Sequence, residues 1–218
     1  ILNFPKMFMN TFVIAIFTCI ISTIFVLSVA YSMSRMRFKM RKPFMNIAMI
    51  IGLFPSFMSM IAVYYILRAL NLADGAMIRV ALIIVFSAGS GAGFYVAKGF
   101  FDTISKSLDE AAIIDGATRW NVFTKITVPL SKPIIVYTIL TSFMGPWVDF
   151  IFGKVICRAD AQYYTVSIGL WKMLEKEYID SWYTCFAAGA VVVSIPIAIL
   201  FLMTQKFYVE GMTGAVKG

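Results

Sequence analysis

The sequence predicts an all-α membrane protein, a polytopic helical bundle that forms a single domain over residues 1–218. Hydrophobic residues make up 61% of the chain, and a soluble domain of this size needs far more polar surface. Charged residues make up 14% and fall in clusters. The runs between these clusters are long enough for helices that cross a bilayer.

Five runs with few or no charges are the predicted spans, at about residues 10–33, 43–67, 80–97, 133–152 and 181–205. Pro55 predicts a kink in the second span, and Gly145-Pro146 predicts a break near the end of the fourth. Pro196 lies inside the fifth span. The chain starts with Ile close to an apolar run and shows no cleavable leader, so we expect an N-terminal segment to be missing.

The distribution of Lys and Arg predicts how the chain is oriented. If the five spans are right, residues 34–42, residues 98–132 and the C-terminal tail share one face and hold twelve of the 19 Lys and Arg residues. The positive-inside rule places that face in the cytoplasm, which makes residues 153–180 an outer loop. The net charge of +8 therefore indicates orientation, and no nucleic-acid partner is expected. The basic run at 35–42 could also bind anionic membrane lipid, although anchoring the topology is a sufficient role.

The polar segment at residues 98–132 predicts a helix, a turn and a second helix on the cytoplasmic face. Ser107 and Glu110 have the spacing of a capping box. Asp115-Gly116 is a typical helix stop, and Thr118 is placed to cap a second helix at residues 119–128. Taken alone, the pattern also fits a helical hairpin that only connects two spans.

The sequence offers no catalytic or metal-binding constellation. It contains no His, and its three Cys residues have no metal-ligand spacing. No phosphate-binding loop is present, so no cofactor is expected in this chain. Gly89, Gly93 and Ala97 recur every four residues, which predicts close helix packing; a catalytic Ser90 in this stretch would lack a base.

The predicted outer loop is rich in aromatic side chains. Two interpretations stay open for them: an aromatic belt at the membrane interface, or a surface for an external partner or a sugar. The residues concerned are Tyr163, Tyr164, Trp171 and Tyr178, whereas Trp182 and Tyr183 best fit the belt. Asp149 is a functional candidate because it is an ionisable residue near the outer end of a span, but a solvated span end beside Trp147 is the favoured explanation.

The central segment resembles the EAA loop of binding-protein-dependent ABC importer permeases. Residues 110–133 read EAAIIDGATRWNVFTKITVPLSKP, with the family's pattern in the right place between two spans. Residues 30–43, 53–67 and 211–218 also resemble the carbohydrate branch, in particular the MalG-like subunits of maltose-type importers. Members of this branch usually have one more N-terminal span.

The resemblance implies the type I importer permease fold, with five core helices around a translocation path. It implies that the EAA helix is a coupling helix that docks on a cytoplasmic ATPase dimer, where ATP and Mg²⁺ would bind. The implied coupling residues are Asp109, Glu110, Ala111, Ala112, Asp115, Gly116, Ala117 and Arg119. We expect the charges of Asp109, Glu110 and Arg119 at the rim, and we expect Phe123, Ile126 and Val128 to be buried under the spans.

The same resemblance implies the other partners of a permease in a bacterial cell membrane. These are a MalF-like second permease, an extracytoplasmic solute-binding protein and a sugar. The outer loop, with Tyr163, Tyr164, Trp171 and Tyr178, would reach toward the binding protein, and residues 213–218 would extend toward the ATPase dimer. Maltodextrin-like oligosaccharides are favoured, while other oligosaccharides and other solute classes stay open.

Two rival functions remain at this stage. An ion-coupled secondary carrier needs a carboxylate near the bilayer midplane, and the predicted spans offer none there. An intramembrane enzyme needs a base beside a nucleophile, and the chain has no His.

Overall fold

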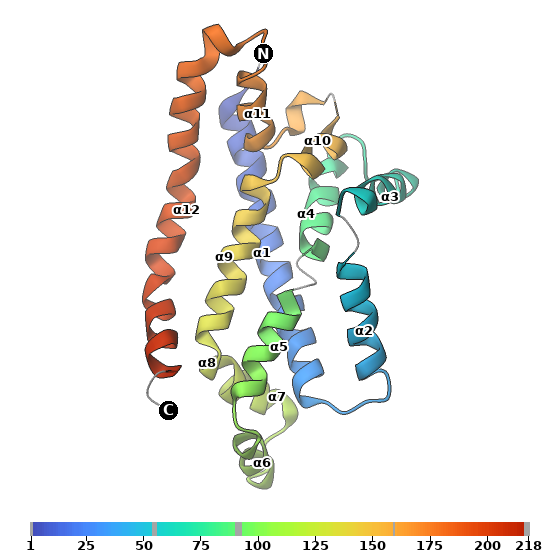
Figure 1. The fold of residues 1–218 in the computed structure, drawn as a ribbon, viewed down its shortest axis with the longest axis vertical. Coiled ribbons are helices and arrows are strands. Elements are labelled where there is room, and N and C mark those ends of the chain that lie inside the picture. The colour runs from blue at the N-terminus through green and yellow to red at the C-terminus, as the bar shows by residue number, and fades with distance from the viewer. Residues whose placement is uncertain (1, 54–55, 90–92, 159, 216–218) are drawn as a thin grey trace.

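The structure is a computed structural model that describes residues 2–53, 56–89, 93–158 and 160–215. Within these ranges every regular element is a helix (Figure 1). Pro55, Ser90 and the last three residues of the tail lie outside the described residues.

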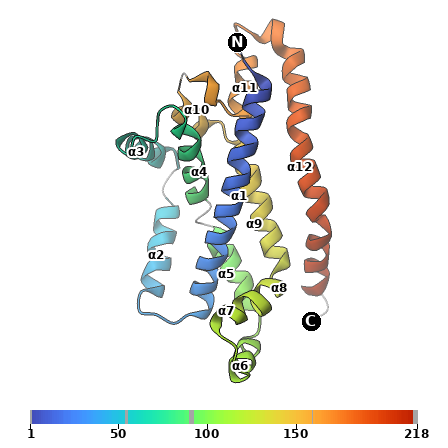
Figure 2. The ribbon, with the colours of Figure 1, turned by 180° about the vertical axis from the view of Figure 1, so that it is seen from behind.

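Helix α1, Phe4–Arg35, runs through the middle of the molecule (Figure 2). Its N-cap is Asn3, whose Oδ1 accepts a hydrogen bond from the Lys6 N–H at 3.1 Å, and Pro5 occupies the first turn, where no intrahelical donor is lost. Helices α4, α5, α9 and α11 all pack on α1. The first predicted span is therefore confirmed as a helix, and it extends beyond residues 10–33 at both ends.

The second and third predicted spans are each divided into two helices. Residues 43–67 fall in α2, Arg41–Gly52, and α3, Ser56–Ala69. Residues 80–97 fall in α4, Met77–Gly89, and α5, Gly93–Thr103, whose axes differ by 43°. The kink predicted at Pro55 in the first of these runs lies outside the described residues. The bend within residues 80–97 was not predicted, because an apolar composition by itself does not show where the backbone turns.

The last two predicted spans are helices α9, Lys132–Val148, and α12, Ile179–Ala215. Helix α9 continues through Pro146, so the break predicted at Gly145-Pro146 is wrong. Pro146 lies in the last turn, where its missing N–H removes one i→i−4 hydrogen bond without ending the helix, and it is buried together with Trp147. Trp147 packs edge-on against Phe8 of α1, with ring centroids 5.2 Å apart, which holds this turn in place.

Two of the described helices, α1 and Ile179–Phe207 of α12, are each long and apolar enough to cross a membrane. The number rises to four if each of two bent pairs forms one span: α4 with α5, and Arg119–Leu130 with α9. Many large apolar side chains on α2 and α12 are exposed, as expected for helices whose neighbours are lipid or another subunit.

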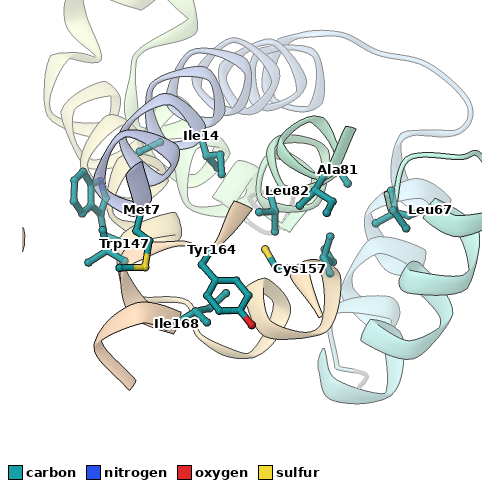
Figure 3. Packing of buried hydrophobic residues seen from close by; sticks show 14 of the residues in the cluster. Met7, Ile14, Leu67, Ala81, Leu82, Trp147, Cys157, Tyr164 and Ile168 are labelled. Carbon is teal, nitrogen blue, oxygen red and sulfur yellow. The ribbon is translucent and has the colours of Figure 1, made fainter. Parts of the chain in front are cut away.

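Residues 153–180, predicted as an outer loop, are mostly helical. They form the end of α10, Ile151–Cys157, the short helix η3, Ala161–Tyr163, and α11, Val166–Met173. These helices gather at the same end of the molecule as the N-terminus and α3 (Figure 1). We call residues 149–173 the outer cap. Its core includes Tyr164 and Ile168, which pack with Met7 of α1 and Trp147 of α9 (Figure 3).

The opposite end carries the polar central segment. It consists of α6, Lys106–Ile114, α7, Arg119–Val122, the π-helix η2, Phe123–Thr127, and α8, Val128–Leu130. The connection from α1 to α2 and the C-terminal end of α12 lie at this same end (Figures 1 and 2). The three segments that the charge distribution assigned to one face are thus together in space.

Candidate functional site: the α6 segment and its attachment to α1

Helix α6 begins two residues earlier than the capping-box pattern predicts. Its N-cap is Ser105, whose backbone is extended (ψ 131°) and whose Oγ accepts from the Ser107 N–H at 3.3 Å. Ser107 lies inside the helix and hydrogen-bonds the Ser105 hydroxyl at 2.7 Å. The predicted Ser107–Glu110 box is therefore wrong, because a capping residue needs non-helical dihedral angles and Ser105 has them.

The end of α6 and the start of α7 form as predicted. Gly116 has φ +86°, the left-handed conformation that residues with a Cβ rarely adopt. Its N–H bonds the Ile113 carbonyl at 3.0 Å, and the Ala117 N–H bonds the Ala112 carbonyl at 2.9 Å, as in a Schellman motif. Thr118 caps α7 by accepting from the Asn121 N–H at 3.2 Å. A rigid turn therefore joins the two helices.

Arg35, the last residue of α1, is held against α6 by a buried ion pair. Its Nε lies 3.0 Å from Oδ2 of Asp109, and the two side chains are 3% and 12% exposed. Its Nη2 also donates to the Ile104 carbonyl at 2.8 Å. Asp109 was expected at an exposed rim, but the structure buries it beneath α6, where it attaches that helix to α1.

Two further bonds reinforce this attachment. The Tyr31 hydroxyl donates to the Arg119 carbonyl at 3.3 Å, and the Ser34 hydroxyl donates to Oδ1 of Asp102 at 2.6 Å. Lys98 pairs with the other oxygen of Asp102 at 2.5 Å. We call the contacts of residues 31–35 with residues 102–119 the α1–α6 clasp. The clasp joins the polar segment to the C-terminal end of α1.

The outward side of the α6 segment combines exposed charge with exposed apolar surface. Glu110, Ala111, Asp115, Gly116 and Arg119 are exposed, while Ala112 and Ala117 are half-buried. Four large apolar side chains are also exposed here, Ile114 by 85% and Trp120 by 70%, together with Leu108 and Ile113. Sequence reasoning missed this apolar surface, although Ile113-Ile114 within a polar segment was a usable sign of it.

Behind this surface, α7 and η2 pack under the spans. Val122 and Thr127 are buried, and the Phe123 ring lies 4.7 Å from that of Tyr31. The residues predicted to be buried here, Phe123, Ile126 and Val128, are half-buried, so the inward face is rotated by about one residue from the prediction. The packing still fixes the segment to α1.

At the other end, α1 is bonded to the outer cap. The Asn10 amide donates to the carbonyls of Gln162 and Tyr164 at 2.9 and 3.2 Å, and its Oδ1 accepts from Nε of Arg79 at 3.0 Å. The Thr11 hydroxyl accepts from the Val166 N–H at 2.9 Å. Two buried polar residues of α1 therefore provide hydrogen-bond partners for backbone groups of the cap.

The aromatic residues of the outer cap divide into two groups. Tyr164 is only 2% exposed, and its hydroxyl donates to the Arg158 carbonyl at 3.1 Å, so it is a core residue and cannot contact a partner as predicted (Figure 3). Tyr163 is half-buried beneath Arg79, 5.4 Å from its ring centroid. Trp171 is 54% exposed and Tyr178 40%. Only these last two present a large aromatic surface to the outside.

Asp149 is half-buried between α9 and α10, where Oδ2 accepts from the Gly153 N–H at 2.8 Å. Burial raises the pKa of this carboxyl, and the backbone N–H groups of Gly153 and Phe152 partly oppose the shift. Asp149 lies directly after the end of α9, beside the buried Trp147, and its carboxylate caps the first turn of α10. Burial, with a smaller contribution from Asp160, raises the pKa of the Cys157 thiol to about 12, which makes it unreactive at neutral pH.

The predicted small-residue stripe is only partly used. Ala97 is fully buried, and a Cβ added to Gly93 would lie 3.7 Å from Val26 of α1, an ordinary contact. Gly89 faces open space, and the bend between α4 and α5 separates it from the other two. The periodic spacing assumed one straight helix, which the chain does not form. Among the described residues, no group of His, Cys, Asp and Glu could hold a metal ion.

Comparison with known proteins identifies the family. Residues 24–212 match the family described as binding-protein-dependent transport system inner membrane component.

The chain belongs to this family.

This permease is similar to sugar-transport permeases. It is 35% identical to the galactooligosaccharides transport system permease protein GanQ of Bacillus subtilis, over all of this chain and 76% of that protein. It is 32% identical to the maltodextrin permease MalD of Streptococcus pneumoniae, over 97% of this chain and 74% of that one. It is 33% identical to MalG of Escherichia coli, over 87% and 64%.

A solved structure shares the permease's fold. A chain of a bacterial ABC transporter involved in the import of the acidic polysaccharide alginate aligns with a TM-score of 0.76 and 26% identity, over 94% of this chain and 75% of that one. The type I importer fold inferred from the EAA pattern is confirmed. Membership of an inner-membrane transport family also removes the secondary carrier and the intramembrane enzyme as readings of this chain.

Proposed function

We propose that this permease is one of two membrane subunits of an ATP-driven oligosaccharide importer in a bacterial cell membrane. Its partners are a MalF-like second permease, an ATPase dimer that binds ATP and Mg²⁺, and an extracytoplasmic solute-binding protein. Similarity to permeases named for galactooligosaccharides and maltodextrin supports the substrate class. Maltodextrin-like chains are our first candidate for the sugar.

The observation that supports the coupling role is that one side of α6 is bonded to α1 while the opposite side is exposed. The Arg35–Asp109 ion pair holds the helix to α1, while Ile114 and Trp120 extend into solvent. Exposed apolar side chains with charges at the margin, here Glu110 and Arg119, are typical of a surface that docks on another protein. We assign the ATPase as that partner, and residues 109–119 form the coupling region. Within this region Asp109 contributes through its ion pair with Arg35.

Helix α1 can pass movement of α6 across the membrane. It is unbroken from Phe4 to Arg35, and it is bonded at one end to α6 and at the other to the outer cap. When the ATPase dimer closes, a shift of α6 therefore reaches the outer cap through one rigid helix. Alternating access is then an exchange between two packings of the helices, driven by ATP.

The outer cap is the proposed contact with the binding protein. Trp171 and Tyr178 supply exposed aromatic surface, and Tyr163 and Tyr164 support the cap from within. In this arrangement the α6 end faces the cytoplasm, as the concentration of Lys and Arg at that end requires.

Two substitutions in α6 test the coupling role. Glu110→Lys reverses an exposed charge, and Gly116→Pro cannot keep φ at +86° or donate to Ile113. In the complete transporter in proteoliposomes, both should leave the chain inserted and assembled but separate ATP hydrolysis from sugar uptake. Lys39→Gln, an exposed change outside the clasp, is the matched control. Normal uptake by both α6 variants contradicts the coupling assignment.

The sugar is tested separately, with the cognate binding protein and a panel of oligosaccharides in calorimetric titrations. Binding of maltodextrins or galactooligosaccharides, followed by uptake of the same sugar, supports the proposal. Binding of only a non-carbohydrate solute contradicts the substrate class and leaves the coupling proposal intact.

A further inference from the structure

A cavity of about 450 Å³ lies between the end of α1, the start of α2 and helix α6. Positive side chains from helices α1, α2, α6 and α7 and from the α1–α2 connection line it: Arg35, Arg37, Arg41, Lys106 and Arg119. Asp109 and Glu110 are the acids in its lining. The cavity is thus a cationic hollow beside the coupling region.

The acids of the cavity do not balance its cations. Asp109 is already paired with Arg35. Within the residues that the structure describes, Arg37, Arg41 and Lys106 form no salt bridge. Like charges gathered around one hollow repel one another, and an anion inside it removes that repulsion.

Arg35 adds an observation that points to a ligand. Its side chain is 3% exposed, its Nε pairs with Asp109, and its Nη2 bonds the Ile104 carbonyl. Its third nitrogen, Nη1, is buried and has no hydrogen-bond acceptor in the described part of the chain. A buried guanidinium N–H without an acceptor is unfavourable, so an acceptor placed in this cavity would be bound well.

We propose that this cavity binds the phosphate group of an anionic phospholipid or of a soluble phosphate ester. Planar guanidinium groups match the oxygens of phosphate and bind them through paired hydrogen bonds, and four Arg residues line this cavity. The cavity lies where the apolar part of α1 ends, which is the depth of lipid phosphates. A phosphate bound here bridges the basic segment 35–41 and α6, so it stabilises the α1–α6 clasp. A phosphate site is not part of the proposed transport function, and its test measures phosphate binding, not transport.

The test uses the complete transporter, purified with its partner permease and ATPase. Arg37→Gln/Arg41→Gln removes two cavity charges and leaves the proposed coupling residues intact. Lys39→Gln/Lys42→Gln removes the same charge from the same segment but outside the cavity lining. Retention of phosphatidylglycerol against phosphatidylcholine is measured by native mass spectrometry, and the thermal midpoint is measured with and without inorganic phosphate.

We expect the wild type and the Lys39/Lys42 variant to retain phosphatidylglycerol or to be stabilised by inorganic phosphate. Affinity in the Arg37/Arg41 variant should fall at least about tenfold, since each lost charged hydrogen bond weakens binding substantially. Lipid retention alone identifies the lipid as the source, and a response to inorganic phosphate alone identifies a soluble phosphate.

Equal behaviour of all three proteins in both arms overturns the proposal. The proposal is also overturned if the wild type binds neither probe and the Arg37/Arg41 variant loses the ATPase. The cavity then receives acidic side chains of the ATPase and not a phosphate. If the double variant does not assemble, Lys106→Gln, which lines the same cavity from α6, repeats the comparison.

Discussion

The two ends of α1 are both bonded to segments that follow much later in the sequence, but by different chemistry. At the α6 end, two bonds join charged or polar side chains, Arg35 with Asp109 and Ser34 with Asp102, and two more go to backbone carbonyls. At the outer end, Asn10 and Thr11 bond mainly to backbone groups of the cap. The outer cap also encloses a buried apolar cluster, whereas α6 exposes most of its surface.

This difference indicates which end is built to move. Backbone groups of the outer cap are satisfied within a packed core, so cap and α1 form one rigid unit. Helix α6 is attached through a few side chains, whose bonds can rearrange when a partner pulls on the helix. We therefore expect the α6 end to be the hinge and the outer end to follow α1.

The largest effect is expected from Arg35→Ala, which breaks the clasp. It leaves the buried Asp109 carboxylate without its partner, a loss of about 3–5 kcal/mol in the free energy of unfolding. Thermal unfolding of the purified transporter and the ratio of ATP hydrolysed to sugar imported measure the outcome. Adding Asp109→Ala removes the unpaired charge and should recover part of the stability but not the coupling. A double variant less stable than Arg35→Ala argues against the ion pair.

A smaller effect is expected at the other end from Asn10→Ala. It removes the donor to two carbonyls and the acceptor of Arg79, at about 2 kcal/mol in the free energy of unfolding. Because the cap then loosens from α1, stimulation of ATP hydrolysis by the binding protein should fall, while basal hydrolysis stays near wild type. Met9→Ala, at an exposed neighbouring position, is the control. An unchanged stimulation contradicts a rigid outer end.

Gly169→Ala tests the close approach of α11 to α1 within the cap. A Cβ at this position would lie 2.3 Å from Sδ of Met7, so one of the two helices or the Met7 side chain has to shift. We expect the free energy of unfolding to fall by about 1 kcal/mol, since the flexible Met7 thioether adapts better than a branched side chain would. Met7 is buried, so Met7→Ala is itself destabilising, but in that background Gly169→Ala should no longer lower the thermal midpoint. An equal loss in both backgrounds places the strain elsewhere.

The smallest effect is expected where α5 packs on α1, from Gly93→Ala. The added Cβ makes an ordinary contact with Val26 at 3.7 Å. We expect the free energy of unfolding to change by less than about 0.5 kcal/mol. A loss as large as that of Gly169→Ala in the same thermal assay shows that α5 packs on α1 more tightly than the structure indicates.

Much of the fold and the location of the site followed from the sequence, but the details of the site did not. The EAA pattern, the Gly116 stop and the Thr118 cap were all readable, because each depends on a few neighbouring residues. The capping box at Ser107 failed because Ser105, two residues earlier, is the N-cap instead. Tyr164 looked like a surface residue because composition does not distinguish a packed cap from a loop.

By itself, the sequence determined the helical class, the membrane environment and the position of the polar segment that carries the EAA pattern. These follow from hydrophobic runs and from capping residues, which act over one or two helical turns. Only the tertiary structure decided that Asp109 faces inward to Arg35 and that Asn10 holds a carbonyl 154 residues away. Such pairs depend on how the helices pack, and no local pattern encodes which distant side chain a buried polar group will meet.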